Sequence, residues 1–154
     1  MKYYKVLTNN YCYKICASDI KLNVNQEIII KNKLDEKEFI LATVVSEIID
    51  APTICNNYLY KILTNDLYID DAVNLTKAQK YIASVAFESN RAQLYDYLVP
   101  KNLDIVNLKN KLVVVNVVNV NKYSIAKVIK IKKIDDFTNL DTKFMKFIVN
   151  CLED

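Results

Sequence analysis

The chain has 154 residues and a formal net charge of +3, with 52% hydrophobic and 25% charged residues, a balance typical of a globular protein. It contains no Gly and no His, which excludes glycine-rich phosphate-binding loops and catalytic pairs built on histidine. The four cysteines fit no zinc-ligand spacing, so we expect free, mostly buried thiols and no cofactor. They are Cys12, Cys16, Cys55 and Cys151.

The first part of the chain, residues 1–66, predicts a small β module. Two short strands, Tyr3–Leu7 and Tyr11–Cys16, flank a pair of asparagines, which form an acceptable turn where no glycine is available. The run Ile28–Ile30 is dense in β-branched residues, and a polar stretch separates it from a longer strand over Phe39–Ile49. This order of strands and turns is typical of consecutive hairpins.

The middle of the chain, residues 67–98, has a different pattern. Leu75, Ala78, Ile82 and Val85 recur at helical spacing, and Pro100 would end such a helix. The spacing predicts a mostly helical segment over about 75–98. We expect it to link two β modules.

The last part, residues 99–154, predicts a second β module. Leu112–Val120 is rich in β-branched residues, and Tyr123–Ile134 carries apolar residues on both parities, which favours a coiled barrel strand with a bulge. Residues 101–134 contain eight lysines and a single acid, Asp104. The basic charge of the protein is therefore concentrated in this module.

An internal repeat appears when the sequence is compared with itself at an offset of 84 residues. The ranges 27–32 and 39–45 then match 111–116 and 123–129. After a slip of one residue, 58–65 matches 143–150. Three blocks in the same order indicate a duplication. We therefore predict an α+β, mainly β fold of two related small β-barrels joined by a helical segment.

The first copy resembles small barrels of the SH3-like, KOW and PSP1-like kind, as in small phage and bacterial proteins. The resemblance covers residues 19–63 and, more faintly, 104–150. In those modules a Gly-Asp turn precedes a Val-rich strand, and this chain has Asn25-Gln26 before Ile28–Ile30. The alanine of the following strand matches Ala42, but the glycine usual before it is absent. The resemblance implies a fold and no functional residue.

Composition also suggests a source and a compartment. Asn, Ile, Lys and Tyr dominate the chain, and all four have AT-rich codons, which favours a phage or viral origin. The first residues carry no apolar signal core, and no apolar run approaches the ~20 residues of a membrane span. We expect a protein of the host cytoplasm or of the virion.

Catalysis is not expected. Neighbouring acids such as Asp35 and Glu36 fall in predicted turns and point apart, and a thiol nucleophile would have only lysine as a base. One carboxylate magnesium site is conceivable on spacing alone. Its ligands would be Asp66, Asp70 and Asp71.

Protein binding is the favoured function. The chain has 11 tyrosines, more than a small core conveniently buries, and tyrosine is enriched at interfaces. A non-catalytic inhibitor, an adaptor on a host protein or a virion component would fit. No membrane or small-molecule partner is expected, and self-association stays open. The candidate binding residues are Tyr11, Tyr13, Tyr58 and Tyr60.

Nucleic-acid binding is the alternative. A lysine-lined strand with an aromatic residue could follow a phosphate backbone and stack a base. Against it, the chain has a single arginine, Arg91, although arginine is favoured for phosphate and base contacts. The candidate residues are Lys122, Tyr123, Lys127, Lys130, Lys132 and Lys133.

Overall fold

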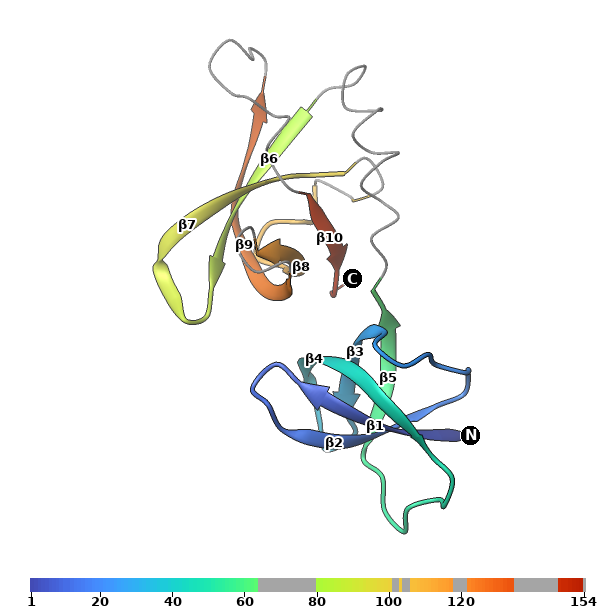
Figure 1. The fold of residues 1–154 in the computed structure, drawn as a ribbon. Helices are drawn as coiled ribbons and strands as arrows, with labels where there is room; N and C mark the ends of the chain where they lie inside the picture. The colour runs from blue at the N-terminus through green and yellow to red at the C-terminus, as the bar shows by residue number, and fades with distance from the viewer. Residues whose placement is uncertain (64–79, 101–102, 104–105, 118–121, 135–146, 154) are drawn as a thin grey trace. The chain divides into compact units, whose positions relative to one another are not determined.

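The computed structural model describes residues 1–63, 80–100, 103, 106–117, 122–134 and 147–153. This described part consists of strands and turns and contains no helix. The chain divides into two compact units, Met1–Thr64 and Asn65–Asp154, each with its own sheet (Figure 1).

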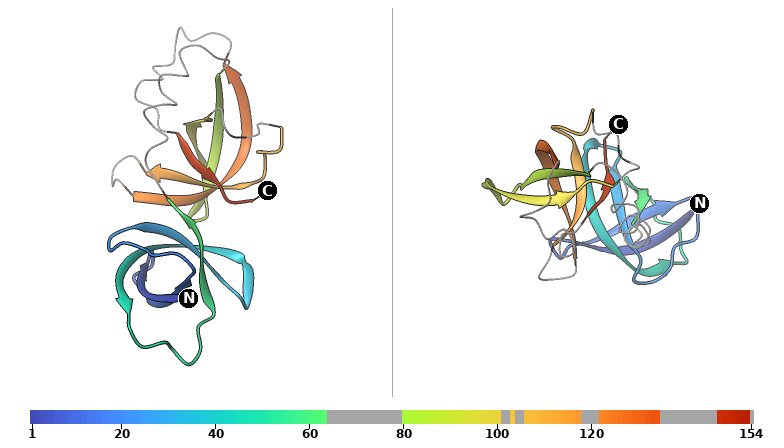
Figure 2. Two further views of the ribbon diagram at one scale, coloured as in Figure 1. Left: turned by 90° about the vertical axis from the view of Figure 1, so that its right-hand side faces the viewer. Right: turned by 90° about the horizontal axis from the view of Figure 1, so that it is seen from above.

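The first unit is a closed five-stranded barrel with the order β1-β2-β5-β3-β4. All neighbours are antiparallel except β2 and β5, which run parallel. In the left view of Figure 2 these strands curl into a ring. A small SH3-like barrel is compatible with this architecture. The strands are β1 (Lys2–Thr8), β2 (Tyr13–Ser18), β3 (Glu27–Asn32), β4 (Asp35–Ile48) and β5 (Asn57–Ile62).

The second unit is a five-stranded sheet with the order β10-β8-β9-β6-β7. Leu98 at the end of β7 forms one parallel bridge with Phe147, the residue directly before β10. The strands are β6 (Lys80–Phe87), β7 (Asn90–Leu98), β8 (Leu112–Val117), β9 (Lys122–Ile134) and β10 (Ile148–Cys151).

The two units repeat one topology strand for strand. Replacing β1–β5 by β6–β10 in the barrel order reproduces every pairing of the second sheet, and the parallel bridge takes the place of the β2–β5 pairing. The irregularities also recur. Each long strand has one unpaired bulge residue, Val45 in β4 and Ile129 in β9. The match in topology therefore extends over all five strands of each unit.

The turn before β3 and the turn before β8 have the same backbone conformation. Asn25 and Asn110 both have φ 70°, in the left-handed region that glycine usually fills. Their backbone N–H groups donate to the carbonyls of Val44 and Val128, each at 2.8 Å. Asparagine thus replaces the missing glycine of this turn, because its short polar side chain tolerates that conformation.

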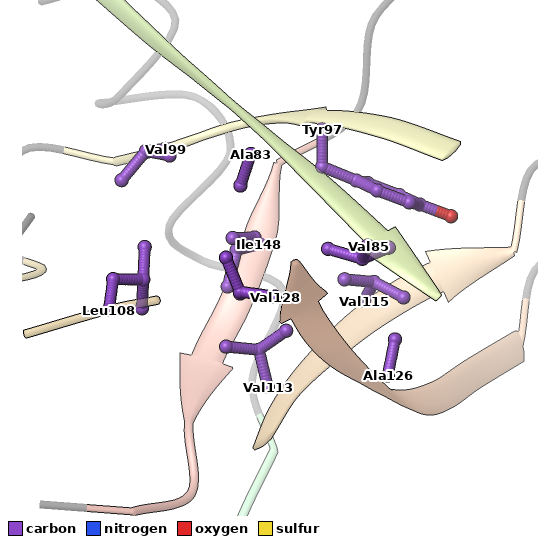
Figure 3. Packing of buried hydrophobic residues seen from close by; sticks show 10 residues of the cluster. All are labelled: Ala83, Val85, Tyr97, Val99, Leu108, Val113, Val115, Ala126, Val128 and Ile148. Carbon is purple, nitrogen blue, oxygen red and sulfur yellow. The ribbon is translucent and has the colours of Figure 1, made fainter. Parts of the chain in front are cut away.

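The two cores match position by position. Alternation along β3 and β8 puts the first and third residues of each buried triplet inside, and in both units the first residue lies opposite an alanine of the long strand. The first core contains Tyr4, Val6, Cys16, Leu22, Ile28, Ile30, Ala42 and Val44. The second, which Figure 3 shows gathered between its strands, contains Ala83, Val85, Tyr97, Val99, Leu108, Val113, Val115, Ala126, Val128 and Ile148.

One core pair exchanges its large and small members between the units. In the first unit Tyr4 lies opposite Cys16, and in the second Ala83 lies opposite Tyr97. All four residues are buried. The Tyr4 hydroxyl accepts a hydrogen bond from the Leu22 N–H at 2.9 Å, so the buried phenol is satisfied. Each core therefore holds one tyrosine at this level, contributed by a different strand.

The α+β class and the helical joining segment predicted from sequence are wrong, and of the two predicted barrels the described residues close one, that of the first unit. Residues 80–98 form the hairpin β6–β7 and belong to the second sheet, while residues 75–79 lie outside the described part of the chain. The apolar spacing misled because Ile82 and Ala83 are both buried. A strand that is apolar on both faces mimics helical periodicity.

The first and third blocks of the predicted repeat are also corrected. Ile28 lies opposite Ala42 and Val113 opposite Ala126, so residues 27–32 correspond to 112–117 and not to 111–116. Strand pairing aligns Leu59 with Ile148, which lie opposite the equivalent residues Ile30 and Val115. It aligns Ile62 with Cys151, which lie opposite Ile28 and Val113. The equivalent of β5 is therefore β10. Part of the sequence match, residues 143–146, lies outside the described residues.

Candidate functional site

An aromatic–lysine cluster lies on the outer face of the first barrel. The Lys31 ammonium is 4.8 Å from the Phe39 ring centroid and 4.9 Å from that of Tyr60. The two rings are 5.4 Å apart and tilted by 53°, and the Lys61 ammonium is 5.8 Å from the Tyr60 ring. These cation–π and ring contacts hold four side chains from three adjacent strands in one arrangement.

Strand register explains why these residues meet. Lys31 pairs with Phe39 across the β3–β4 hairpin, so their side chains share a face. On the other side of β3 the register shifts at Tyr60, because Ile29 pairs with Lys61 and Ile30 with Leu59. This bulge brings Tyr60 to the outer surface beside Lys61.

Tyr58 extends the cluster along β5. It pairs with Lys31 on one side and with Ala17 on the other. Its hydroxyl donates to the Glu36 carboxylate at 3.5 Å. Burial, and then the negative charge of Glu36, raises the pKa of the Tyr58 phenol, so this hydroxyl is a neutral hydrogen-bond donor at physiological pH.

A pocket of about 360 Å³ adjoins Tyr58. Its lining mixes apolar side chains with one acid, Asp19, and one base, Lys33. Ile20 is 50% exposed there. Tyr58 thus belongs to both the cluster and the pocket rim. The full lining is Met1, Ala17, Ser18, Asp19, Ile20, Lys33, Tyr58 and Leu59.

The other two predicted tyrosines lie elsewhere on the barrel. Tyr13 is 61% exposed at the start of β2, with the Lys5 ammonium 4.3 Å from its ring. Tyr11 is 75% exposed in the preceding turn. Tyr13 is four residues along β2 from Ala17, the partner of Tyr58, a separation of about 13 Å. The structure therefore brings Tyr58 and Tyr60 together and places Tyr11 and Tyr13 away from them.

The predicted lysines lie on β9 of the second unit. Lys127, Lys130, Lys132 and Lys133 are exposed. Lys133 pairs with Tyr81 and so has the parity of the core-facing positions, opposite to that of Lys132. Tyr123 is half-buried, and the side chain of Lys122 lies outside the described part of the chain.

Sequence reasoning missed Lys31, Phe39 and Lys61. The hairpin register between Lys31 and Phe39 could have been inferred from the alternation of the flanking strands. The contact of Tyr60 with Lys31 could not be inferred, because it depends on a bulge in a strand pairing between distant segments.

The remaining chemistry of the described residues is sparse. None of them forms a group of three or more acidic or cysteine side chains that could hold a metal ion, and Asp66, Asp70 and Asp71 lie outside the description. Of the four free cysteines only Cys16 is buried, fewer than expected. Burial, and then the charge of Cys55, raises the pKa of the Cys16 thiol to about 12, so this thiol is a poor nucleophile.

The structure describes no helix that is both long and apolar enough to cross a membrane.

No protein-family model, curated protein or solved structure matches this chain. What the chain binds is therefore inferred from its own side chains.

Proposed function

We propose that the chain is a non-catalytic binding protein whose first barrel holds a segment of another protein. The observation that carries this proposal is the aromatic–lysine cluster with its neighbouring pocket. Lys31 between the rings of Phe39 and Tyr60 fixes those side chains before binding, so little conformational entropy is lost when a partner contacts them. Fixed aromatic side chains beside a pocket are typical of binding hot spots.

A comparison of the two units supports this proposal. At the positions of Lys31 and Phe39 the second unit has Asn116 and Tyr123, and at the position of Tyr60 it has Val149. Because the second unit has the same topology and a matching core, the fold does not require the cluster. We infer that the cluster serves a contact of the first unit alone.

The chemistry of the surface suggests the kind of partner segment. An apolar side chain would enter the pocket beside Tyr58, and acidic groups on either side of it would approach Lys31, Lys33 and Lys61. The bias toward AT-rich codons supports a phage origin, and with it a host or virion protein as the partner. The kinship to SH3-like, KOW or PSP1-like modules is part of the same proposal.

The proposal is tested by selecting peptide ligands for the full chain from a displayed random library. Binding of the selected peptides is then compared between the wild type and the single variants Tyr58→Ala and Tyr60→Ala. We expect each variant to raise the Kd about thirtyfold, or about 2 kcal/mol, where the ring is a central anchor. Tyr11→Ala and Tyr13→Ala are matched controls, because they remove exposed tyrosines at a distance from the cluster.

The selected sequences provide an independent readout. Enrichment of acidic residues beside one apolar residue supports the proposed partner chemistry. Equal losses in all four tyrosine variants, or no loss at Tyr58 and Tyr60, would overturn the assignment of this face.

A further inference from the structure

We propose that the second unit carries a separate surface for the phosphate backbone of single-stranded nucleic acid. This surface is the lysine row, defined as Lys127, Lys130 and Lys132 on the outer face of β9. It does not depend on the function proposed for the first barrel, because it uses other residues on the other unit.

The bulge at Ile129 creates the row. Residues 127 and 130 would point to opposite faces of a regular strand, since side chains alternate. Here Val85 pairs with Val128 and Ser84 with Lys130, which leaves Ile129 unpaired. The extra residue resets the alternation, so that Lys127, Lys130 and Lys132 all lie on the face away from the core.

The core contacts confirm this geometry. Ala126 and Val128 are buried in the core cluster and Ile131 packs against it, so these residues mark the inner face on both sides of the bulge. The exposed residues between them therefore face outward. Neither Lys127, Lys130 nor Lys132 forms an ion pair within the described residues. The carboxylate of Asp96, two strands away, accepts a hydrogen bond from Ser84 at 2.6 Å.

The first barrel shows that the lysines are not a requirement of the fold. Its long strand β4 has the same bulge, at Val45. The residues of β4 that occupy the places of the three lysines are neutral: Thr43, Ser46 and Ile48. All three outer positions thus differ in charge while the cores match. A difference concentrated on one face points to a ligand of that face.

Two features favour a single strand over a duplex. Tyr123 lies on the same outer face of β9 as Lys127, since both are an odd number of residues from the buried Ala126. An aromatic ring can stack on an unpaired base but not on one inside a duplex. Lys130 and Lys132 are about 6.7 Å apart along the strand, far enough for each ammonium to contact a different phosphate of a flexible single strand. Contacts of this kind depend little on base sequence.

The test is fluorescence anisotropy of the full chain with a labelled mixed-sequence single-stranded DNA oligonucleotide between 50 and 200 mM salt. The variant changes the row to Lys127→Glu, Lys130→Glu and Lys132→Glu together. We expect at least a tenfold loss of affinity at 50 mM salt. The slope of log K against log salt should become shallower by about 2, because three phosphate contacts on a single strand are lost. A triple Lys→Gln variant removes the three charges without reversing them. It should therefore lose less affinity than the triple Glu variant but show the same decrease in slope.

A matched control carries the same change in net charge at exposed lysines outside the row: Lys21→Glu, Lys37→Glu and Lys109→Glu. We expect its affinity to stay within about threefold of the wild type at 50 mM salt. Equal losses in the two triple variants would show a diffuse charge effect and overturn the assignment, as would failure of the wild type to bind the oligonucleotide.

Two further measurements decide the class of ligand. Tyr123→Ala should weaken single-strand binding several-fold, and a duplex of the same sequence should bind more weakly than the single strand. Heparin binding as tight as that of the oligonucleotide, with no effect of Tyr123→Ala, would mean a general polyanion site and overturn the single-strand proposal. Tyr58→Ala and Tyr60→Ala should leave oligonucleotide binding unchanged, which separates this test from that of the protein-binding face.

Discussion

Asparagine at two equivalent turns is the clearest residue-scale adaptation of a chain without glycine. Asn25 and Asn110 have the same positive φ and make the same backbone hydrogen bonds to the neighbouring long strand. The sequence predicted this substitution, because Asn25-Gln26 occupies the place of a Gly-Asp turn. It could not reveal that Asn110 has the same role, since the repeat is displaced by one further residue at that turn.

We expect Asn25→Ala and Asn110→Ala each to lower the free energy of unfolding by about 1–2 kcal/mol, because a Cβ without a local hydrogen-bonding group is strained in the left-handed region. Asn25→Gly and Asn110→Gly should keep most of the stability. Urea denaturation of each variant measures both effects. Asn23→Ala is the control, since Asn23 begins the same turn without a positive φ, and an equal loss there would contradict the explanation.

At the scale of elements, bulges decide which face each side chain occupies. The apolar residues on both parities of Tyr123–Ile134 predicted a bulge, and this is confirmed. Its position could not be derived from the pattern, because Ile129 is apolar like the core residues of the same strand. It is instead 36% exposed, because the bulge removes it from the alternation. The position depends on pairing with β6, a contact between distant segments.

Deleting Ile129 should leave the second unit folded. Without the bulge residue the pairs Val85–Val128 and Ser84–Lys130 follow each other directly, and regular alternation keeps Ile131 on the inner face and the lysines on the outer face. Amide hydrogen exchange should therefore show β6 and β9 protected as in the wild type. Ile129→Thr, which keeps the bulge residue, is the control. Loss of protection in β6 and β9 after the deletion, with β1–β5 still protected, would contradict this description of the bulge.

At the scale of the whole molecule, each unit has its own core. The two core clusters share no residue. The sequence predicted some residues of the candidate site on the first barrel, but not the contacts between them. Tyr58 and Tyr60 were foreseeable as tyrosines on a strand, whereas their contacts with Lys31 and Phe39 depend on register, and Tyr11 and Tyr13 were grouped with them only by residue type. The hairpin β6–β7 was predicted as a helix for the same reason. Its conformation depends on the pairing of β6 with β9, a contact between distant segments that the local pattern does not show.

A fragment of residues 1–64 should therefore fold alone. Its barrel is closed and its core is internal, but domains of about 60 residues bury little surface, so we expect no more than about 3–5 kcal/mol of stability. Circular dichroism during urea titration should show one cooperative transition from a β-type spectrum. A fragment that unfolds without a cooperative transition would contradict the independence of the first core.

The exchanged core pair has a consequence for how a chain with two copies of one topology avoids misassembly. If β6 took the place of β1, Ala83 would face Cys16 and leave a void where the Tyr4 ring belongs. If β1 took the place of β6, Tyr4 would meet Tyr97 in space that holds one ring. Both exchanges cost several kcal/mol, one by a cavity and the other by overpacking. Because the tyrosine belongs to opposite members of this pair in the two units, packing favours the pairing of each sheet with its own first strand.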